Sequence, residues 1–397
     1  MITHQILLLL LAGYIVFSID KKQNYFPVPV VLVLLGIVLS FVPIFQEITI
    51  TKEIIFNVFL PALLFTSSYS FSVQALRKNK WLIGGMGTVG LILTVAILGL
   101  SIYMVGNLFI DLSFIVSLLI AGILSPTDPV SVVSILKNST SDEKVADVVE
   151  GESLLNDGTS IVVFTVLLEM YLHDQSFSVS SFIGEFLFVS LGGVLIGIIF
   201  GWLLSKAIHY TSHRQYQVML SIIIAYGSFY LGEFLGVSGV LATVTSGLLL
   251  SYEFGKHHRE EHFRDSLDGF WTIIEPTILS IIFLLIGIQS ADYLFDVPWS
   301  LAIVIFILSL VSRFIVLASS TIMIPRWHHR FTLKDSGLIT WAGIKGTMSV
   351  ALLLGLEAEA SSDHLLVSLT FSVIVLSLII QSIGVYPIIN KLSKENR

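Results

Sequence analysis

The residues best suited to chemistry stand together in one short stretch, Gly151 to Asp157. Ser153 and Asp157 are four residues apart, and Asn156 and Ser160 fall on the same side of a helix with that spacing. One helical face therefore presents a carboxylate, an amide and two hydroxyls. Such hard oxygen groups suit a small alkali cation rather than a soft metal. The plainer interpretation, that the amide and carboxylate only hold helices together by hydrogen bonds, also fits this spacing.

This stretch lies within an apolar segment, about 146–172, that is long enough to cross a membrane as one helix. Asp157 then falls near the middle of the span. An ionisable group at that depth is costly unless it faces a cavity or a partner, so it marks a functional site. Because burial favours the neutral form of a carboxylic acid, a proton and an alkali cation would compete for Asp157. A carrier that moves only when this aspartate is neutralised exchanges one for the other.

The composition predicts an all-α polytopic membrane protein. The chain has 397 residues, of which 55% are hydrophobic and 12% charged, and its mean hydropathy is +0.90. A soluble domain carries about twice that charged fraction. The absence of cysteine excludes disulfides, thiolate metal sites and cysteine nucleophiles. The apolar start, residues 1–19, lacks a basic region and a cleavage site, so we expect a membrane helix there and not a signal peptide.

About thirteen membrane helices are predicted from apolar length and from breaks at glycine or proline. They cover residues 5–19, 27–42, 53–72, 82–106, 112–136, 146–172, 180–207, 215–236, 237–253, 269–289, 299–323, 335–357 and 363–391. With the N-terminus outside, nearly all of the 21 lysines and arginines fall in loops on the inner side. This asymmetry places the C-terminus in the cytoplasm of a cell-membrane protein.

Two predicted helices are interrupted. The fifth contains Ser125-Pro126-Thr127-Asp128-Pro129, and the twelfth contains Gly343-Ile344-Lys345-Gly346. Each interruption lies in the second-last helix of a six-helix half, and such pairing indicates a secondary transporter with inverted repeats. We therefore expect a single transmembrane domain over 1–397. Its first repeat would cover about 5–172, a linker helix 180–207, and its second repeat about 215–391.

Two other sequence features concern the packing of the predicted helices. The stretch Gly85 to Gly90 fits the pattern GxGxxG, but no strand precedes it, so close helix packing by small residues is the better interpretation. Arg313 lies inside the eleventh predicted helix and needs either a counter-charge or a route by which its side chain reaches the membrane interface. Glu275 and Glu233 are candidates, and the sequence does not choose between them.

Three motifs in this order and spacing, at 125–129, 151–157 and 341–346, resemble those of the monovalent cation/proton antiporters. The most similar branch is the electroneutral one, which contains bacterial sodium/proton antiporters and animal sodium/hydrogen exchangers. The resemblance covers essentially the whole chain. It implies two unwound helices that cross near the midplane and a homodimer in the lipid bilayer. It implies no enzymatic activity, no nucleic-acid partner and no cofactor beyond the transported ions.

The resemblance also implies roles for individual residues. Asp157 would alternately bind a proton and a cation. The other implied ion-site residues are Thr127, Asp128, Ser153 and Asn156. Asp157, Thr127 and Ser153 would be the groups that touch the cation. Glu152 would form a structural ion pair with Lys345.

Two positions depart from the family pattern. Lys345 stands where arginine is usual, and lysine cannot make the same two-pronged contact with a carboxylate. Thr66 stands where the family often has glutamate.

Sodium is the expected cation, and lithium and potassium remain open. A single titrating aspartate beside a neutral Asn156 suggests one proton per cation.

Two other classes of function fit some of these residues. A channel or uniporter could use Asp157 as a selectivity charge, and it would move no protons in exchange. An intramembrane aspartyl protease would need two aspartates, for which Asp128 and Asp157 are available. Its usual Gly-x-Gly-Asp context is missing, because glycine follows Asp157 and does not precede it.

Overall fold

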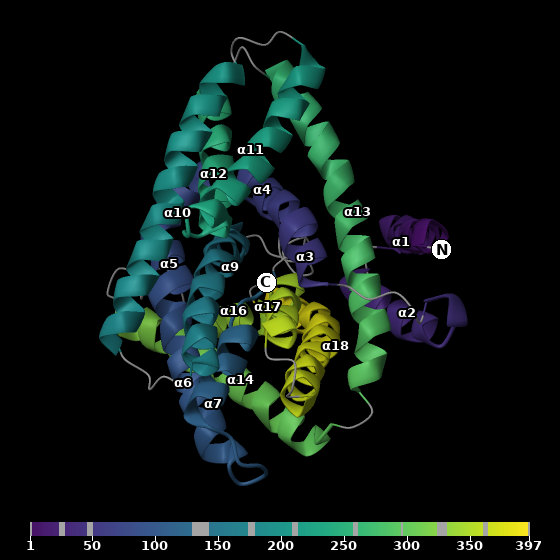
Figure 1. Cartoon of the computed structure of the whole chain (residues 1–397), viewed down its shortest axis with the longest axis vertical. Helices are drawn as coiled ribbons and strands as arrows, with labels where there is room; N and C mark the ends of the chain where they lie inside the picture. The colour runs from purple at the N-terminus through teal and green to yellow at the C-terminus, as the bar shows by residue number, and fades with distance from the viewer. Residues whose placement is uncertain are drawn as a thin grey trace.

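The computed structural model describes residues 2–23, 28–45, 51–128, 143–173, 179–208, 213–256, 261–294, 297–323, 332–359 and 364–395. Within these ranges the chain is helical, and its only extended pairing is a single antiparallel bridge between Asp128 and Ile344. Figure 1 shows that long helices make up the molecule. The predicted all-α membrane class is confirmed.

Long helices form most of the molecule. They are α9 (Glu143–Leu172), α10 (Val179–Ile208), α11 (Arg214–Phe234), α12 (Gly239–Lys256), α13 (Glu261–Tyr293), α14 (Trp299–Met323) and α18 (His364–Glu395). In the described part of the chain, eight segments are long and apolar enough to cross a membrane, and three shorter apolar helices accompany them. The protein is thus a multi-pass membrane protein. The count of thirteen spans and the division into two repeats remain predictions.

The N-terminal part contains α1 (Ile2–Gln23), α2 (Val28–Ser40) and a short turn of 3₁₀ helix, η1 (Pro43–Phe45). Two spans that follow each contain five residues of wider π-helix. The first joins α3 (Lys52–Ile54), η2 (Ile55–Phe59) and α4 (Leu60–Ser70). The second joins α5 (Val73–Gly85), η3 (Met86–Gly90) and α6 (Leu91–Gly106).

The second of these spans begins nine residues before its predicted start at 82, because Ser72 caps it. The hydroxyl of Ser72 accepts a hydrogen bond from the backbone N–H of Ala75 at 3.3 Å. Inside this span, a Cβ added to Gly87 would lie 2.7 Å from the Cβ of Leu155 on α9. The GxGxxG stretch therefore serves close helix packing, as predicted.

The two predicted interruptions are real breaks. Helix α7 (Phe114–Leu124) ends just before Ser125 and Pro126, and proline cannot supply the N–H that a continuing helix needs. Residues 129–142 lie outside the described part of the chain, so only the first half of this break is seen. The second break separates α16 (Leu333–Ala342) from α17 (Thr347–Glu359). The two breaks meet where the backbone N–H of Asp128 donates to the carbonyl of Ile344 at 2.8 Å.

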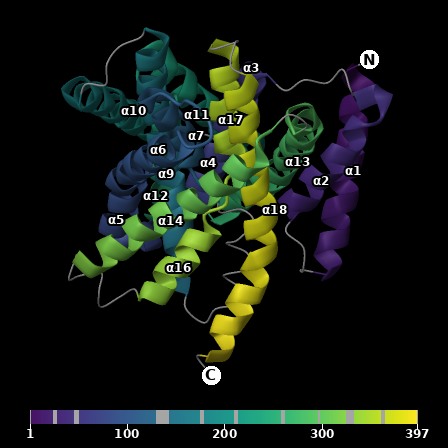
Figure 2. The same ribbon diagram turned by 90° about the horizontal axis from the view of Figure 1, so that it is seen from below.

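Figure 2 shows α18 running beside α16 and α17. Helices α1 and α2 pack against α13 at the edge of the molecule. Helices α10, α11 and α12 pack against one another, as Figure 1 shows, and α12 also packs against α4. The outward face of α10 carries exposed apolar side chains, among them Leu187, Phe188 and Leu191. That face is suited to contact with lipid.

Candidate functional site

Helix α9 positions the central stretch. It runs without interruption from Glu143 to Leu172 and places Asp157 near its middle, as predicted. The side chain of Asp157 is partly buried, and its Oδ1 atom is buried without a hydrogen-bond partner among the described residues. The Oδ1 atom of the fully buried Asn156 is in the same situation. Two neighbouring residues therefore hold buried oxygen atoms that are available to a ligand.

Thr127 connects α9 to the broken helix α7. The hydroxyl of Ser153 donates to the backbone carbonyl of Thr127, and Nδ2 of Asn156 donates to Oγ1 of Thr127 at 2.9 Å. The carbonyl of Thr127 accepts this side-chain bond because it lies beyond the end of α7. The structure thus brings Thr127, Ser153 and Asn156 together, although their role as ion ligands stays a prediction.

The partner of Glu152 differs from the one expected. Its Oε2 atom accepts a hydrogen bond from Nη2 of Arg313 at 2.6 Å, and both side chains are buried. The expected pairing of Glu152 with Lys345 is therefore wrong. Arg313 reaches across from α14 and forms the strong, charge-assisted bond that a guanidinium makes with a carboxylate.

The counter-charge of Arg313 is therefore Glu152, and neither Glu275 nor Glu233. Glu233 has another hydrogen-bond partner, because its Oε1 atom accepts from the backbone N–H of Gly239 at 2.9 Å. The other oxygen of Glu152 accepts from Nδ2 of Asn156 at 3.3 Å. The ion pair is thereby linked to the amide that lies beside Asp157.

Lys345 is buried in the break between α16 and α17, close enough to Arg313 and Glu152 to interact with both electrostatically. Its backbone N–H donates to the hydroxyl of Ser377 on α18 at 2.9 Å. The position of this lysine at the crossing agrees with the resemblance. Its side chain lies near the Glu152–Arg313 pair but is not a member of that pair.

Asp128 lies against the start of α17. A Cβ added to Gly346 would overlap the side chain of Asp128 and would come within 2.8 Å of its Cγ. Only glycine leaves room for this approach. The carboxylate therefore sits beside the N-terminal end of a half-helix, where the unpaired N–H groups carry partial positive charge and a negative group is stabilising.

The carboxyl groups of Asp128 and Glu152 are close enough to Asp157 to repel its charge. Arg313 supplies a positive charge to this group through its ion pair with Glu152. Binding of a proton or a cation at Asp157 would relieve the remaining repulsion, since the ion pair already neutralises Glu152. Within the described ranges, no three side chains of His, Cys, Asp or Glu lie together in a way that could hold a metal ion, so an ion at Asp157 would also need neutral oxygens.

Two further residues form hydrogen bonds within their own helices. The hydroxyl of Ser160 donates to the carbonyl of Asp157 in its own helix at 2.9 Å. Thr66 is buried and donates to the carbonyl of Ala62 at 2.8 Å. This hydroxyl is therefore satisfied within α4.

Sequence reasoning missed Ser377 and Gln381, whose side chains bond to the break between α16 and α17. Both are fully buried on α18. A signal was present, because two polar residues at a spacing of four in an apolar helix share one face. The sequence alone does not say which helix that face meets.

Comparison with known proteins gives consistent results. A family model described as "Sodium/hydrogen exchanger, transmembrane" matches residues 6–391. The chain is 30% identical to the Na(+)/H(+) antiporter NhaH of Halobacillus aidingensis, over 98% of this chain and 97% of that protein. It is 30% identical to the Na(+)/H(+) antiporter NhaP of Pseudomonas aeruginosa, over 86% of this chain and 81% of that protein. The structure of the sodium proton antiporter MjNhaP1 from Methanocaldococcus jannaschii has a similar fold, with a TM-score of 0.77, 20% identity and 98% of each chain covered.

Proposed function

The chain belongs to the sodium/hydrogen exchanger family, and from this premise we propose that it exchanges protons for monovalent cations across the cell membrane. Sodium is the first expected cation, because the curated relatives are named Na(+)/H(+) antiporters. Lithium and potassium are alternatives to be ranked by experiment. The proposal includes a homodimer, an external N-terminus, a cytoplasmic C-terminus and no cofactor beyond the exchanged ions.

One observation carries the mechanism. Asp157 lies at the centre of a membrane-length helix and holds a buried oxygen with no hydrogen-bond partner in the described chain. A carboxylate in that situation binds a proton or a desolvated cation in preference to remaining charged and bare. Asp157 therefore alternates between proton and cation, and transport occurs when it is neutralised by either one.

The neighbouring residues support this exchange in different ways. Thr127 and Ser153 supply neutral oxygens at the crossing, and Asn156 holds Thr127 in place through its amide. Asp128 balances the start of α17. Because Asp157 is the one titrating group and Asn156 stays neutral, the exchange is one proton for one cation.

The test uses purified protein in liposomes that hold a pH gradient, with a fluorescent pH probe. Added Na⁺, Li⁺ or K⁺ should collapse the gradient in the wild type, and the order of the responses ranks the cations. Asp157→Asn should abolish the collapse while its melting temperature stays that of the wild type. Glu359→Gln is the matched control, because this exposed carboxylate pairs with Lys52 at 3.2 Å, away from Asp157.

Retained exchange in folded Asp157→Asn would refute the role given to this aspartate. Cation flux without any proton counter-movement would favour the channel or uniporter. A voltage-dependent exchange rate in clamped liposomes would contradict the one-for-one ratio.

A further inference from the structure

The break between α16 and α17 creates a local problem of hydrogen bonding. Helix α16 ends at Ala342 and α17 begins at Thr347, so the carbonyls of Trp341 and Gly343 are not followed by a regular helical turn. Gly343 is buried, and so are the residues on either side of it at the crossing. Backbone groups at such depth require other partners.

Helix α18 provides these partners through two side chains. Nε2 of Gln381 donates to the carbonyl of Trp341 at 2.8 Å and to that of Gly343 at 3.3 Å. The hydroxyl of Ser377 accepts from the N–H of Lys345 at 2.9 Å and donates to Oε1 of Gln381. Both side chains have an exposed fraction of 0%, so no water competes for these bonds.

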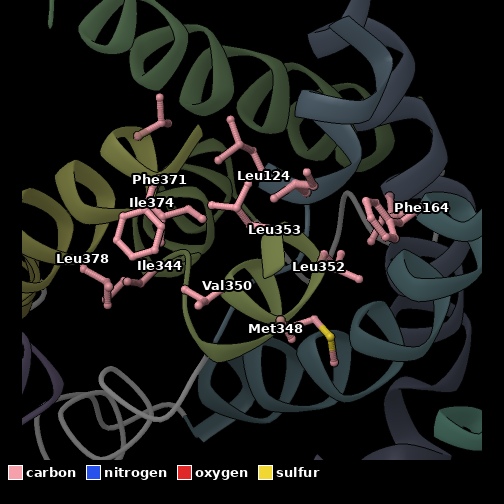
Figure 3. Packing of buried hydrophobic residues seen from close by; sticks show 14 of the residues in the cluster. Leu124, Phe164, Ile344, Met348, Val350, Leu352, Leu353, Phe371, Ile374 and Leu378 are labelled. Carbon is pink, nitrogen blue, oxygen red and sulfur yellow. The ribbon is translucent and has the colours of Figure 1, made fainter. Parts of the chain in front are cut away.

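Further contacts fix α18 against the break. The indole Nε1 of Trp341 donates back to the carbonyl of Gln381 at 2.9 Å. A Cβ added to Gly384 would lie 2.5 Å from Cζ2 of Trp341, so glycine makes room for this indole. Figure 3 shows Phe371 and Ile374 of α18 gathered with Ile344 of the break in one apolar cluster.

A short chain of bonds connects this contact with the ion site. The backbone N–H of Lys345 donates to Ser377. The residue before it, Ile344, accepts at its carbonyl from the N–H of Asp128. Asp128 follows Thr127, which in turn bonds to Ser153 and Asn156 beside Asp157. The position of Thr127 and Asp128 therefore depends on where α18 holds the opposite break.

We propose that Ser377 and Gln381 are positioning residues for the bound cation, acting from α18 through the backbone of residues 341–345. This inference rests on the proposed cation/proton exchange. It predicts that loss of either side chain weakens cation binding even in folded protein. A merely structural role would lower stability and leave cation affinity unchanged.

The first test compares two serine-to-alanine variants on the same helix. Ser377→Ala removes a hydroxyl with two hydrogen bonds. Ser382→Ala removes a buried hydroxyl that makes none in the described chain. In liposomes, Ser377→Ala should raise the Na⁺ concentration for half-maximal exchange about two- to tenfold, the loss expected for one or two buried hydrogen bonds. Ser382→Ala should leave it unchanged, and equal values in the two variants would overturn the proposal.

A binding measurement separates this inference from the proposed exchange. The melting temperature of each purified protein is followed as Na⁺ replaces choline at constant ionic strength, which reports cation affinity without any transport. Weaker stabilisation of Ser377→Ala supports the inference even if proton exchange fails in the liposomes. Wild-type protein that gains no stability from any alkali cation, or variants that gain equally, would overturn it.

Gln381→Glu tests the proposal independently, through the pH dependence of cation affinity. It replaces the first test if Ser377→Ala does not fold. The substituted side chain has nearly the same shape, and its protonated form keeps one donor for the two carbonyls. Its ionised form keeps none and repels them. Its half-maximal Na⁺ concentration, measured relative to the wild type, should therefore increase as the pH rises. A constant ratio across the pH range would contradict a role for the Gln381 donor.

Discussion

Helix backbones approach each other closely in two regions of the molecule. One is the crossing of the two broken helices, the other is the contact between α10 and α12, and the two approaches are made possible in opposite ways. At the crossing, both helices stop, and side chains from α9 and α18 bond to the freed backbone. Between α10 and α12, both helices run unbroken. There a stripe of glycines, Gly193, Gly197 and Gly201, lets the backbones touch.

The difference shows which parts of a membrane protein require buried polar side chains. Irregular backbone in a membrane must find partners within the protein, so it requires buried polar side chains around it. A glycine stripe between unbroken helices needs none, because a regular helix satisfies its own backbone hydrogen bonds. We infer that the crossing carries the ion chemistry and that α10 and α12 form scaffold. The two regions should therefore respond differently to substitution.

The largest effect is expected at the ion pair beside the crossing. Removing the guanidinium in Arg313→Met leaves Glu152 charged and buried, which should cost about 3–5 kcal/mol of stability. Glu152→Gln should be similarly harmful on its own. The double variant should be less destabilised than the sum of the two, because it removes both charges of the pair together. Thermal unfolding of all four proteins in one detergent gives this cycle, and strict additivity would show that the pair is not energetically coupled.

A smaller effect is expected where the two breaks touch. The added methyl group in Gly346→Ala must displace the side chain of Asp128, and overpacking of this kind costs about 1–3 kcal/mol. Because Asp128 adjoins Thr127, the half-maximal Na⁺ concentration should rise as well. Gly337→Ala on α16 is the matched control, since its nearest contact would be 4.0 Å away. Unchanged cation affinity in folded Gly346→Ala would remove Asp128 from the ion site.

The smallest effect is expected in the glycine stripe. In Gly197→Ala the new Cβ would lie 2.7 Å from the Cβ of Thr245 and would overlap the carbonyl of Ala242. The better helix propensity of alanine, about 1 kcal/mol, offsets part of that overpacking. The variant should therefore be modestly destabilised, with unchanged half-maximal Na⁺ concentration in the folded fraction.

Gly184→Ala provides the matched control on the same helix. Nothing lies within 4 Å of its added Cβ, so the propensity gain alone should raise the melting temperature. Opposite signs for the two alanine variants of α10 would confirm that contact with α12 decides the outcome. A weaker cation response in Gly197→Ala would contradict the assignment of this helix pair to the scaffold.

Much of the architecture follows from the sequence because it depends on local rules. Apolar length located most of the membrane helices to within a few residues, and the prolines near 126 and the glycines near 343 located both breaks. The central place of Asp157 in its helix also follows from apolar length alone. These features depend on neighbouring residues, so no knowledge of the packed molecule was needed.

The tertiary structure alone decided which distant groups meet. Several acidic residues in predicted spans could have balanced Arg313, and the choice of Glu152 depends on how α14 packs beside α9. The bonds of Ser377 and Gln381 to the break likewise depend on which face α18 turns toward α16. Sequence fixes which face of a helix a side chain occupies through its period of 3.6 residues, but the neighbour that this face meets is set by packing across the whole bundle.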